Sequence, residues 1–270
     1  MEATKKPFRR ILLTGAAGGL GKQLRQRIGA WADVVRLSDR ANLGEARPGE
    51  EVIHCDLADR DAMIRLLEGV DAVLHFGGIS VEDRWDPILQ ANIIGLKNLY
   101  EAAHKNGVKR LVFASSNHAI GFHPTTEHLD ADSPTRPDGY YGLSKVFGEQ
   151  LSRYYWDRFG IETVCIRIGS VMEVPKTHRI LRTYLHPDDL VELLRCSLVT
   201  PRVGHTIVYG MSGNAAAWWD NSKARHLGFR PKHSSDEYEY LFPFTGYPSD
   251  GDEPSKYQGG PFVTQGPMYE

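Results

Sequence analysis

Hydrophobic and polar positions alternate between two kinds of segment along the first two thirds of the chain. Short continuous apolar runs are typical of strands that are buried on both faces of a sheet. They occur at residues 10–14, 34–37, 51–55, 72–76, 110–114 and 163–168. Amphipathic helices are predicted where apolar residues recur three and four positions apart. This pattern occurs at residues 20–28, 60–67, 86–106 and 140–159.

This order of elements predicts a fold class. Strands that alternate with helices indicate βαβ units, and right-handed crossovers place the helices on both faces of a parallel sheet. We therefore expect an α/β fold of the Rossmann type, with a doubly wound parallel sheet.

The last third of the chain has a less regular pattern. Residues 187–198 predict a helix, because Pro187 suits its first turn. Residues 205–209 predict a strand, and residues 214–226 predict a helix. From residue 242 the chain is rich in Gly, Pro, Ser and Asp, which indicates an ordered loop or a partly disordered tail.

Composition and charge exclude several classes of protein. The net charge of -2 gives no basic excess, so we expect no nucleic-acid partner. No apolar stretch approaches the roughly 20 residues that span a bilayer, so no membrane segment is expected. The run at 10–14 ends in a Gly-rich turn, which is typical of a first strand and not of a signal peptide. Cys55, Cys165 and Cys196 lack metal or redox spacing, which favours reduced thiols in a cytoplasmic protein and no metal.

A glycine-rich segment, TGAAGGLG at residues 14–21, joins the first predicted strand to the first predicted helix. Gly15, Gly18 and Gly21 permit a tight turn and a close approach of the backbone to a pyrophosphate. Gly19 and Leu20 begin the helix, whose free N–H groups and positive dipole end attract phosphate. The pattern alone also fits an ordinary surface turn, so it needs support from elsewhere.

An acidic residue at the end of the second strand supplies that support. Asp39 follows Gly21 at the distance where a carboxylate accepts hydrogen bonds from both hydroxyls of the adenosine ribose. A carboxylate there also repels a 2′-phosphate, which favours NAD over NADP. The neighbouring Arg40 keeps NADP open, because an arginine can bind that phosphate.

Residues in three further segments are expected to contact the cofactor. Asp56 and Leu57 follow the third strand, where the adenine edge would lie. Gly77 and Gly78 follow the fourth strand and leave room for the chain to pass beneath the cofactor. Asn92 lies inside the long helix at 86–106 and precedes an apolar pair, so we expect its side chain to turn inward.

A tyrosine and a lysine four residues apart suggest proton transfer. Tyr141 and Lys145 share one face of the predicted helix, and a nearby ammonium is expected to lower the pKa of the phenol from its usual value near 10. Ser116 ends the fifth strand on the rim where parallel sheets bind ligands. We therefore predict one domain with Tyr141, Lys145 and Ser116 as catalytic residues. Residues 1–168 would form its dinucleotide-binding core, and residues 169–270 mainly a small substrate lobe and tail.

Together these motifs resemble the extended short-chain dehydrogenase/reductase family. TGxxGxxG occurs at 14–21, the serine segment at 115–121, YxxxK at Tyr141 and Lys145, and a typical helix segment at 92–95. Within this family the chain is most similar to the uronate dehydrogenases. That similarity lies in SSNHAIGF at 115–122, YYGLSK at 140–145, IRIGSV at 166–171, Arg179 and AAAWWDN at 215–221.

The resemblance implies a reaction and a set of substrate residues. The enzymes it points to use NAD to oxidise glucuronate or galacturonate at the anomeric carbon, giving the aldarate lactone. The implied sugar site consists of Ser80, Ser116, Asn117, His118, Tyr141, Ser170 and Arg179. Arg179 would bind the carboxylate bidentately through its planar guanidinium. The resemblance also implies a homo-oligomer that associates through the helices at 86–106 and 140–159.

Two other functions remain open. Nucleotide-sugar epimerases and dehydratases share the glycine turn and YxxxK but hold NAD permanently, and they generally carry a larger C-terminal lobe than residues 169–270 provide. A non-catalytic NAD-binding module is the second alternative, although such proteins often lose the tyrosine or lysine that this chain retains. The sequence does not rank glucuronate against galacturonate, which differ at one hydroxyl.

Overall fold

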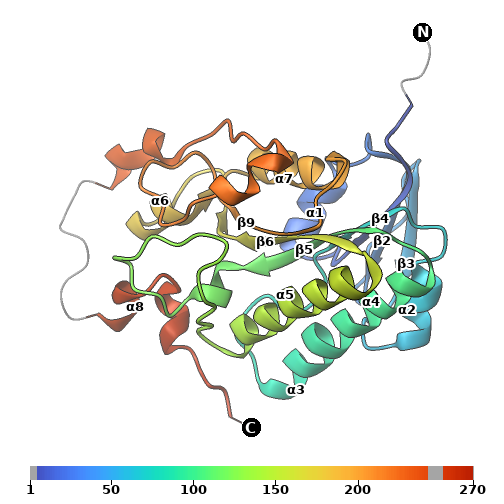
Figure 1. The fold of residues 1–270 in the computed structure, drawn as a ribbon, viewed down its shortest axis with the longest axis horizontal. Coiled ribbons are helices and arrows are strands. Elements are labelled where there is room, and N and C mark those ends of the chain that lie inside the picture. The colour runs from blue at the N-terminus through green and yellow to red at the C-terminus, as the bar shows by residue number, and fades with distance from the viewer. Residues whose placement is uncertain (1–4, 243–251, 270) are drawn as a thin grey trace.

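The computed structural model describes residues 5–242 and 252–269 and confirms the Rossmann-type α/β fold (Figure 1). Seven strands form one parallel sheet in the order β3-β2-β1-β4-β5-β6-β9. Their bounds are β1 Phe8–Thr14, β2 Ala32–Asp39, β3 Glu50–His54, β4 Ala72–His75, β5 Arg110–Ser116, β6 Glu162–Ile168 and β9 His205–Gly210. All seven match runs that the sequence pattern predicts as strands.

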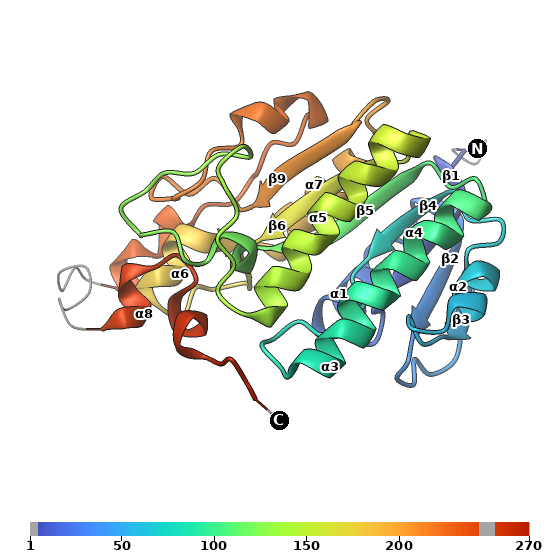
Figure 2. The same cartoon turned by 60° about the horizontal axis from the view of Figure 1, so that its bottom comes forward.

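Helices cover both faces of this sheet. Figure 2 shows α4 (Gly95–Lys105) and α5 (Tyr140–Phe159) side by side across one face, with α2 (Arg60–Leu66) beside them. The other face carries α1 (Gly19–Arg25) and α7 (Pro187–Val199). Each face has its own hydrophobic core, because strands in a parallel sheet are buried on both sides.

The strand order places a crevice between β1 and β4. The chain moves outward from β1 to β2 and β3 and then returns to β4 on the opposite side. Open α/β sheets bind ligands at such a switch point, beyond the carboxyl ends of the strands. The glycine turn after β1, Asp39 at the end of β2 and Ser116 at the end of β5 all lie on this edge.

The long helix predicted at 86–106 is interrupted. It consists of α3 (Trp85–Ile88), a π-helical turn (Leu89–Ile94) and α4. Asn92 lies in the π-helical turn and is buried, as the sequence pattern predicts. Its amide side chain bonds to the backbone N–H and carbonyl of Ile79 and to the Ser144 hydroxyl. Because π-helical turns often occur at functional sites, the turn that carries Asn92 is a candidate functional feature.

The prediction of a helix at residues 214–226 is wrong. Only Ser222–Leu227 is helical, as a 3₁₀ helix. The preceding residues pair their backbone with another loop: Leu129 N–H donates to the Trp218 carbonyl, and Asp220 N–H donates to the Leu129 carbonyl. Trp218 is buried on this irregular segment, so its apolar character reflects tertiary burial and not an amphipathic helix.

Small elements complete the last third. These are β7 Ser170–Val171 paired with β8 Tyr184–Leu185, α6 His178–Thr183, α8 Glu253–Lys256 and the 3₁₀ helices Ser235–Leu241 and Gly260–Thr264. Another 3₁₀ helix, Asn117–Ile120, directly follows β5. Figure 2 shows α6, α8 and the C-terminal segment beyond the carboxyl ends of β5 and β6. The predicted tail is thus ordered over 252–269, and residues 243–251 lie outside the described part. No described helix is long and apolar enough to cross a membrane.

Candidate active site

A cleft of about 740 Å³ opens at the carboxyl edge of the sheet, within the size range of small-molecule sites. It gathers most of the residues that the sequence suggests. They are Gly15, Gly18, Gly19, Leu20, Gly21, Asp39, Asp56, Leu57, Gly77, Ser80, Ser116, Asn117, His118, Tyr141 and Lys145. Three suggested residues, Asn92, Ser170 and Arg179, are not among the described residues that line it.

The glycine turn is shaped to receive a pyrophosphate. Gly15 has a positive φ of 70°, and a Cβ there would overlap the Phe76 carbonyl of the neighbouring strand. A Cβ at Gly21 would overlap the Gly15 carbonyl, so both glycines are required by close packing. At Gly19, by contrast, no described atom lies within 4 Å of a Cβ position, so this residue faces open space at the start of α1. The cradle therefore fits a phosphate group at a helix N-terminus.

Asp39 is held in place by the same turn. One of its carboxylate oxygens accepts a hydrogen bond from Ala17 N–H at 2.9 Å, and the other accepts one from Ala41 N–H at 2.9 Å. Each oxygen keeps a further lone pair for a ribose hydroxyl. Arg40 is exposed and also lines the cleft, so the structure retains both features that bear on the choice between NAD and NADP.

A buried pair of side chains supports the floor of the cleft. Thr14 Oγ1 accepts a hydrogen bond from Gly77 N–H at 3.1 Å and lies 2.7 Å from His75 Nδ1. Burial, together with the charge of Lys145, lowers the pKa of His75 to about 3, so the ring is neutral. Sequence reasoning missed His75, because it lies within a continuous apolar strand.

Tyr141 and Lys145 project from the first turns of α5, and both are buried. Lys145 Nζ donates to the Ala114 carbonyl at 2.9 Å and lies 5.4 Å from the centre of the Tyr141 ring. Burial lowers the pKa of Lys145 to about 8. The pKa of Tyr141 is raised to about 12, because burial and, to a smaller degree, the charge of Asp138 outweigh the lowering effect of the Ser116 hydroxyl.

The expected direction of the Tyr141 pKa shift is therefore wrong for this structure. Lys145 was expected to lower the pKa, but removing the phenolate from water costs more than the neighbouring groups restore. Ser116, and not Lys145, is the neighbour that lowers the pKa of the phenol.

The two remaining sugar-site residues belong to the C-terminal part. Ser170 Oγ lies 2.9 Å from Thr183 Oγ1 and so joins β7 to the end of α6. Arg179, in α6, donates to the Gln258 carbonyl, which connects it to the C-terminal segment.

Besides His75, the sequence pattern does not predict three further residues near the cleft. Glu82 accepts hydrogen bonds from Tyr140 N–H and Tyr141 N–H, both at 2.9 Å. Asp138 lies 2.7 Å from His118, and Phe262 stacks on His118 with ring centres 3.7 Å apart. Only Asp138 carried a signal, since an acidic residue just before a helix is common.

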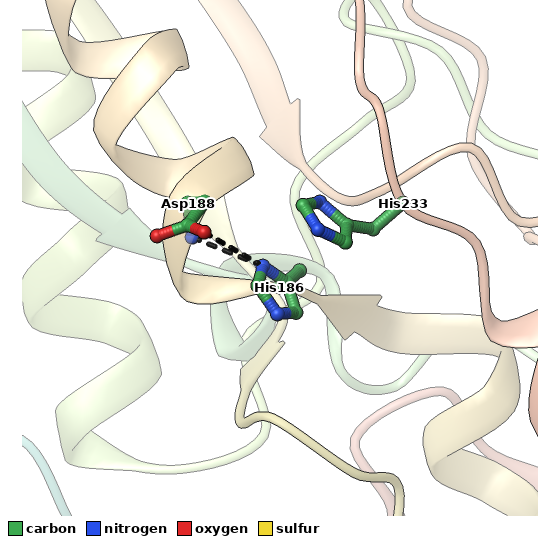
Figure 3. A group of neighbouring side chains, drawn as sticks. All are labelled: His186, Asp188 and His233. Atoms are coloured by element: carbon green, nitrogen blue, oxygen red, sulfur yellow. Dashed lines mark hydrogen bonds and ion pairs between the residues drawn. The ribbon is translucent and has the colours of Figure 1, made fainter.

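A group of three side chains lies outside the cleft near the start of α7 (Figure 3). His186, Asp188 and His233 offer ligand atoms within 4.8 Å of one another, a spacing that could hold a metal ion. However, His186 Nδ1 accepts from Asp188 N–H, and its Nε2 lies 3.0 Å from a Glu173 oxygen. The His233 ring stacks on His186 at 3.5 Å and 15°, and its Nδ1 lies 3.3 Å from an Asp189 oxygen. We interpret this group as a helix cap and not as a metal centre.

The fold and the cleft define a class of protein. A glycine turn, an acid after β2 and a buried tyrosine–lysine pair at the switch point are the features of a Rossmann-type dinucleotide-dependent enzyme. The chain belongs to the NAD dependent epimerase/dehydratase family, whose model matches residues 11–178. The resemblance to the extended short-chain dehydrogenases/reductases is thereby confirmed.

Similar proteins span nearly the whole chain. A uronate dehydrogenase of Pseudomonas putida is 54% identical over 98% of this chain and 99% of the relative. One of Agrobacterium fabrum is 47% identical over 95% of this chain and 97% of the relative. The crystal structure of a mutant uronate dehydrogenase of Agrobacterium tumefaciens complexed with NAD matches with a TM-score of 0.94. It is 45% identical and covers 97% of this chain and 100% of that chain.

Proposed function

We propose that this protein is an NAD-dependent dehydrogenase that oxidises a hexuronate, glucuronate or galacturonate, at the anomeric carbon to the aldarate lactone. The observation that carries the proposal is 54% identity to a uronate dehydrogenase over almost the full length of both chains. The cleft supports it, because the implied residues Ser80, Asn117 and His118 line the same cleft as Tyr141.

In the proposed reaction, Ser116 and Tyr141 receive the anomeric hydroxyl. Tyr141 in its phenolate form accepts the hydroxyl proton as the carbon–oxygen double bond forms and the anomeric hydride leaves. NAD, when bound, supplies the acceptor for that hydride. The sugar ring stays closed, so the new carbonyl is that of a lactone.

Lys145 and Ser116 prepare Tyr141 for this step. Ser116 stabilises the phenolate by a hydrogen bond. Lys145 brings a positive charge within 5.4 Å of the phenol ring and is fixed by the Ala114 carbonyl. Its remaining N–H donors fit the hydroxyls of a nicotinamide ribose.

A panel of substrates tests the reaction. The purified protein is mixed with NAD and glucuronate, galacturonate, glucose or UDP-glucose, and NADH is followed by its absorbance. We expect NADH formation with the two uronates. Equal activity on glucose would contradict the uronate assignment, and conversion of UDP-glucose without net NADH would support an epimerase.

The variant Tyr141→Phe tests the proton acceptor. The ring keeps its packing but loses the oxygen, so kcat should fall by roughly 10²–10⁴-fold, as for loss of a general base. NAD affinity, measured by calorimetry, should stay unchanged. Unaltered turnover would show that Tyr141 is not the base.

The variant Arg179→Ala tests recognition of the uronate carboxylate. We propose that Arg179 reaches the carboxylate from α6, beside the C-terminal segment to which it already donates. The KM for glucuronate should rise by about 10²-fold, the equivalent of roughly 2.7 kcal/mol for a charged hydrogen bond. A similar rise in the KM for NAD would contradict this role.

We also propose that residues after 168 mainly close the sugar site.

We propose in addition that the protein is a homo-oligomer. Leu143 and Tyr154 are exposed on α5, the helix that the resemblance implies in association. Light scattering of the intact protein measures the mass, and a monomer at micromolar concentration would contradict this proposal.

A further inference from the structure

A buried carboxylate lies behind one wall of the cleft. The Asp138 side chain is 0% exposed, and its Oδ2 lies 2.7 Å from His118 Nδ1. The backbones are also joined, because Asp138 N–H donates to the His118 carbonyl at 3.3 Å. The two residues therefore form one rigid unit.

Glycines in three segments make room for this carboxylate. A Cβ at Gly121 or Gly259 would overlap Asp138 Oδ2, and one at Gly142 would lie 3.0 Å from Oδ1. Gly121 follows the 3₁₀ helix after β5, Gly142 lies in α5, and Gly259 belongs to the C-terminal segment. The site is thus packed around this carboxylate from three directions.

Stability alone does not account for this burial. Asp138 Oδ1 has no hydrogen-bond partner within residues 5–242 and 252–269, although it is buried. A buried acceptor without a partner costs roughly 1–3 kcal/mol. Such groups are rare in native proteins, and a catalytic role is one of the explanations for them.

His118 connects this carboxylate to the cleft. It lines the cleft two residues after Ser116, and its backbone N–H donates to Ser116 Oγ at 3.2 Å. Its ring lies 5.7 Å from the Tyr141 ring and stacks on Phe262, which prevents it from turning. Because Nδ1 faces a carboxylate, a neutral ring carries its proton there, and Nε2 becomes an acceptor.

We propose that Asp138 is a positioning residue that acts through His118 on the sugar. Asp138 fixes the ring and its tautomer so that Nε2 accepts a hydrogen bond from a ring hydroxyl of the substrate, next to the carbon that reacts at Tyr141. The ligand class is a polyhydroxylated sugar ring, and the inference rests on the proposed function.

Kinetics of Asp138→Asn tests this role, with Asp132→Asn as the matched control. Asp132 is an exposed aspartate that pairs with Lys223. Asp138→Asn should lower kcat/KM for glucuronate by about 10–100-fold, as loss of a residue that orients a histidine does. The KM for NAD and the values for the control should stay unchanged. An equal loss in the control, or a loss confined to NAD, would overturn the proposal.

A double-mutant cycle separates positioning from general damage. If Asp138 acts through His118, Asp138→Asn has no further effect on kcat/KM in a His118→Ala background. Additive losses in the double variant would overturn the proposal.

An NMR measurement is independent of activity. In protein labelled with ¹⁵N-histidine, the His118 ring should be protonated at Nδ1 alone, and Asp138→Asn should change this state while the Tm stays close to that of the parent. A ring protonated at Nε2 in the parent would overturn the proposal. If the parent fails to oxidise uronates but shows the Nδ1 tautomer, the proposed function fails and the positioning by Asp138 stands.

Discussion

At the scale of residues, the sequence indicates which groups meet but not how the site changes their acidity. Tyr141, Lys145 and Ser116 were identified from spacing and strand order, and the structure brings them into one cleft. The sign of the Tyr141 pKa shift depends on burial, and burial depends on packing by residues far away in the chain. For that reason the spacing of Tyr141 and Lys145 does not predict the direction of this pKa shift.

Removing the Ser116 hydroxyl should shift the pH dependence of the reaction. Ser116→Ala removes the hydrogen bond that lowers the pKa of Tyr141, so this pKa rises further. At saturating NAD, the increase of kcat/KM for glucuronate with pH should then occur about one pH unit higher, since a hydrogen bond to a charged group contributes about 1.5 kcal/mol. A shift toward lower pH would contradict the interaction.

Asp39 should control the choice of cofactor. In Asp39→Ala the repulsion of a 2′-phosphate is lost, while Arg40 remains at the cleft to attract it. The ratio of kcat/KM for NAD to that for NADP should fall by about 10–100-fold, or roughly 1.4–2.7 kcal/mol. The double variant with Arg40→Ala should regain part of the preference, and an unchanged ratio in Asp39→Ala would argue against the role of Asp39.

At the scale of elements, all seven strands of the sheet and the main helices follow from periodicity, because these patterns are local. The features that the sequence pattern does not predict depend on contacts with residues that are distant in the sequence. The segment at 214–226 has helical spacing, but its tryptophans are buried against other loops. The start of α5 is similar: its N-cap is Gly139, and the hydrogen-bond acceptor for its first N–H groups is Glu82, which follows β4.

Removing the Glu82 charge should loosen the start of α5. Glu82→Gln weakens two hydrogen bonds and removes a negative charge at the helix N-terminus, which together should lower the free energy of unfolding by about 1–3 kcal/mol. Chemical denaturation measures this loss, and kcat should fall as well, because Tyr141 lies in that turn. Asp83→Asn serves as the control, and an equal loss there would argue against a specific cap.

At the scale of the whole molecule, the C-terminal segment packs behind His118, a residue that lines the cleft, through the ring of Phe262. Gln258 is 0% exposed, donates to the Pro124 and Glu127 carbonyls and accepts from Trp219 Nε1. The composition of the C-terminal segment predicts a loop or tail, because Gly and Pro obscure any periodicity. Only the folded chain shows where such a segment binds.

Deleting residues 252–270 should therefore impair sugar oxidation more than cofactor binding. The loss of Phe262 and Gln258 leaves His118 and Trp219 without their partners, so kcat/KM for glucuronate should fall by on the order of 10²-fold. NAD affinity should change little, since none of residues 252–269, the described part of this segment, lines the cleft. Deleting only 268–270, where Met268 and Tyr269 are exposed, should preserve activity.

The position of Phe262 also bears on biosynthesis. The ribosome makes the seven strands, the glycine turn and α5 before it makes residues 252–264. A nascent chain can thus assemble its sheet and its dinucleotide cradle while the aromatic wall beside His118 is still missing. Under the proposed function, competence to oxidise a sugar is acquired only once residues 252–264 have been made, after the cofactor half of the molecule.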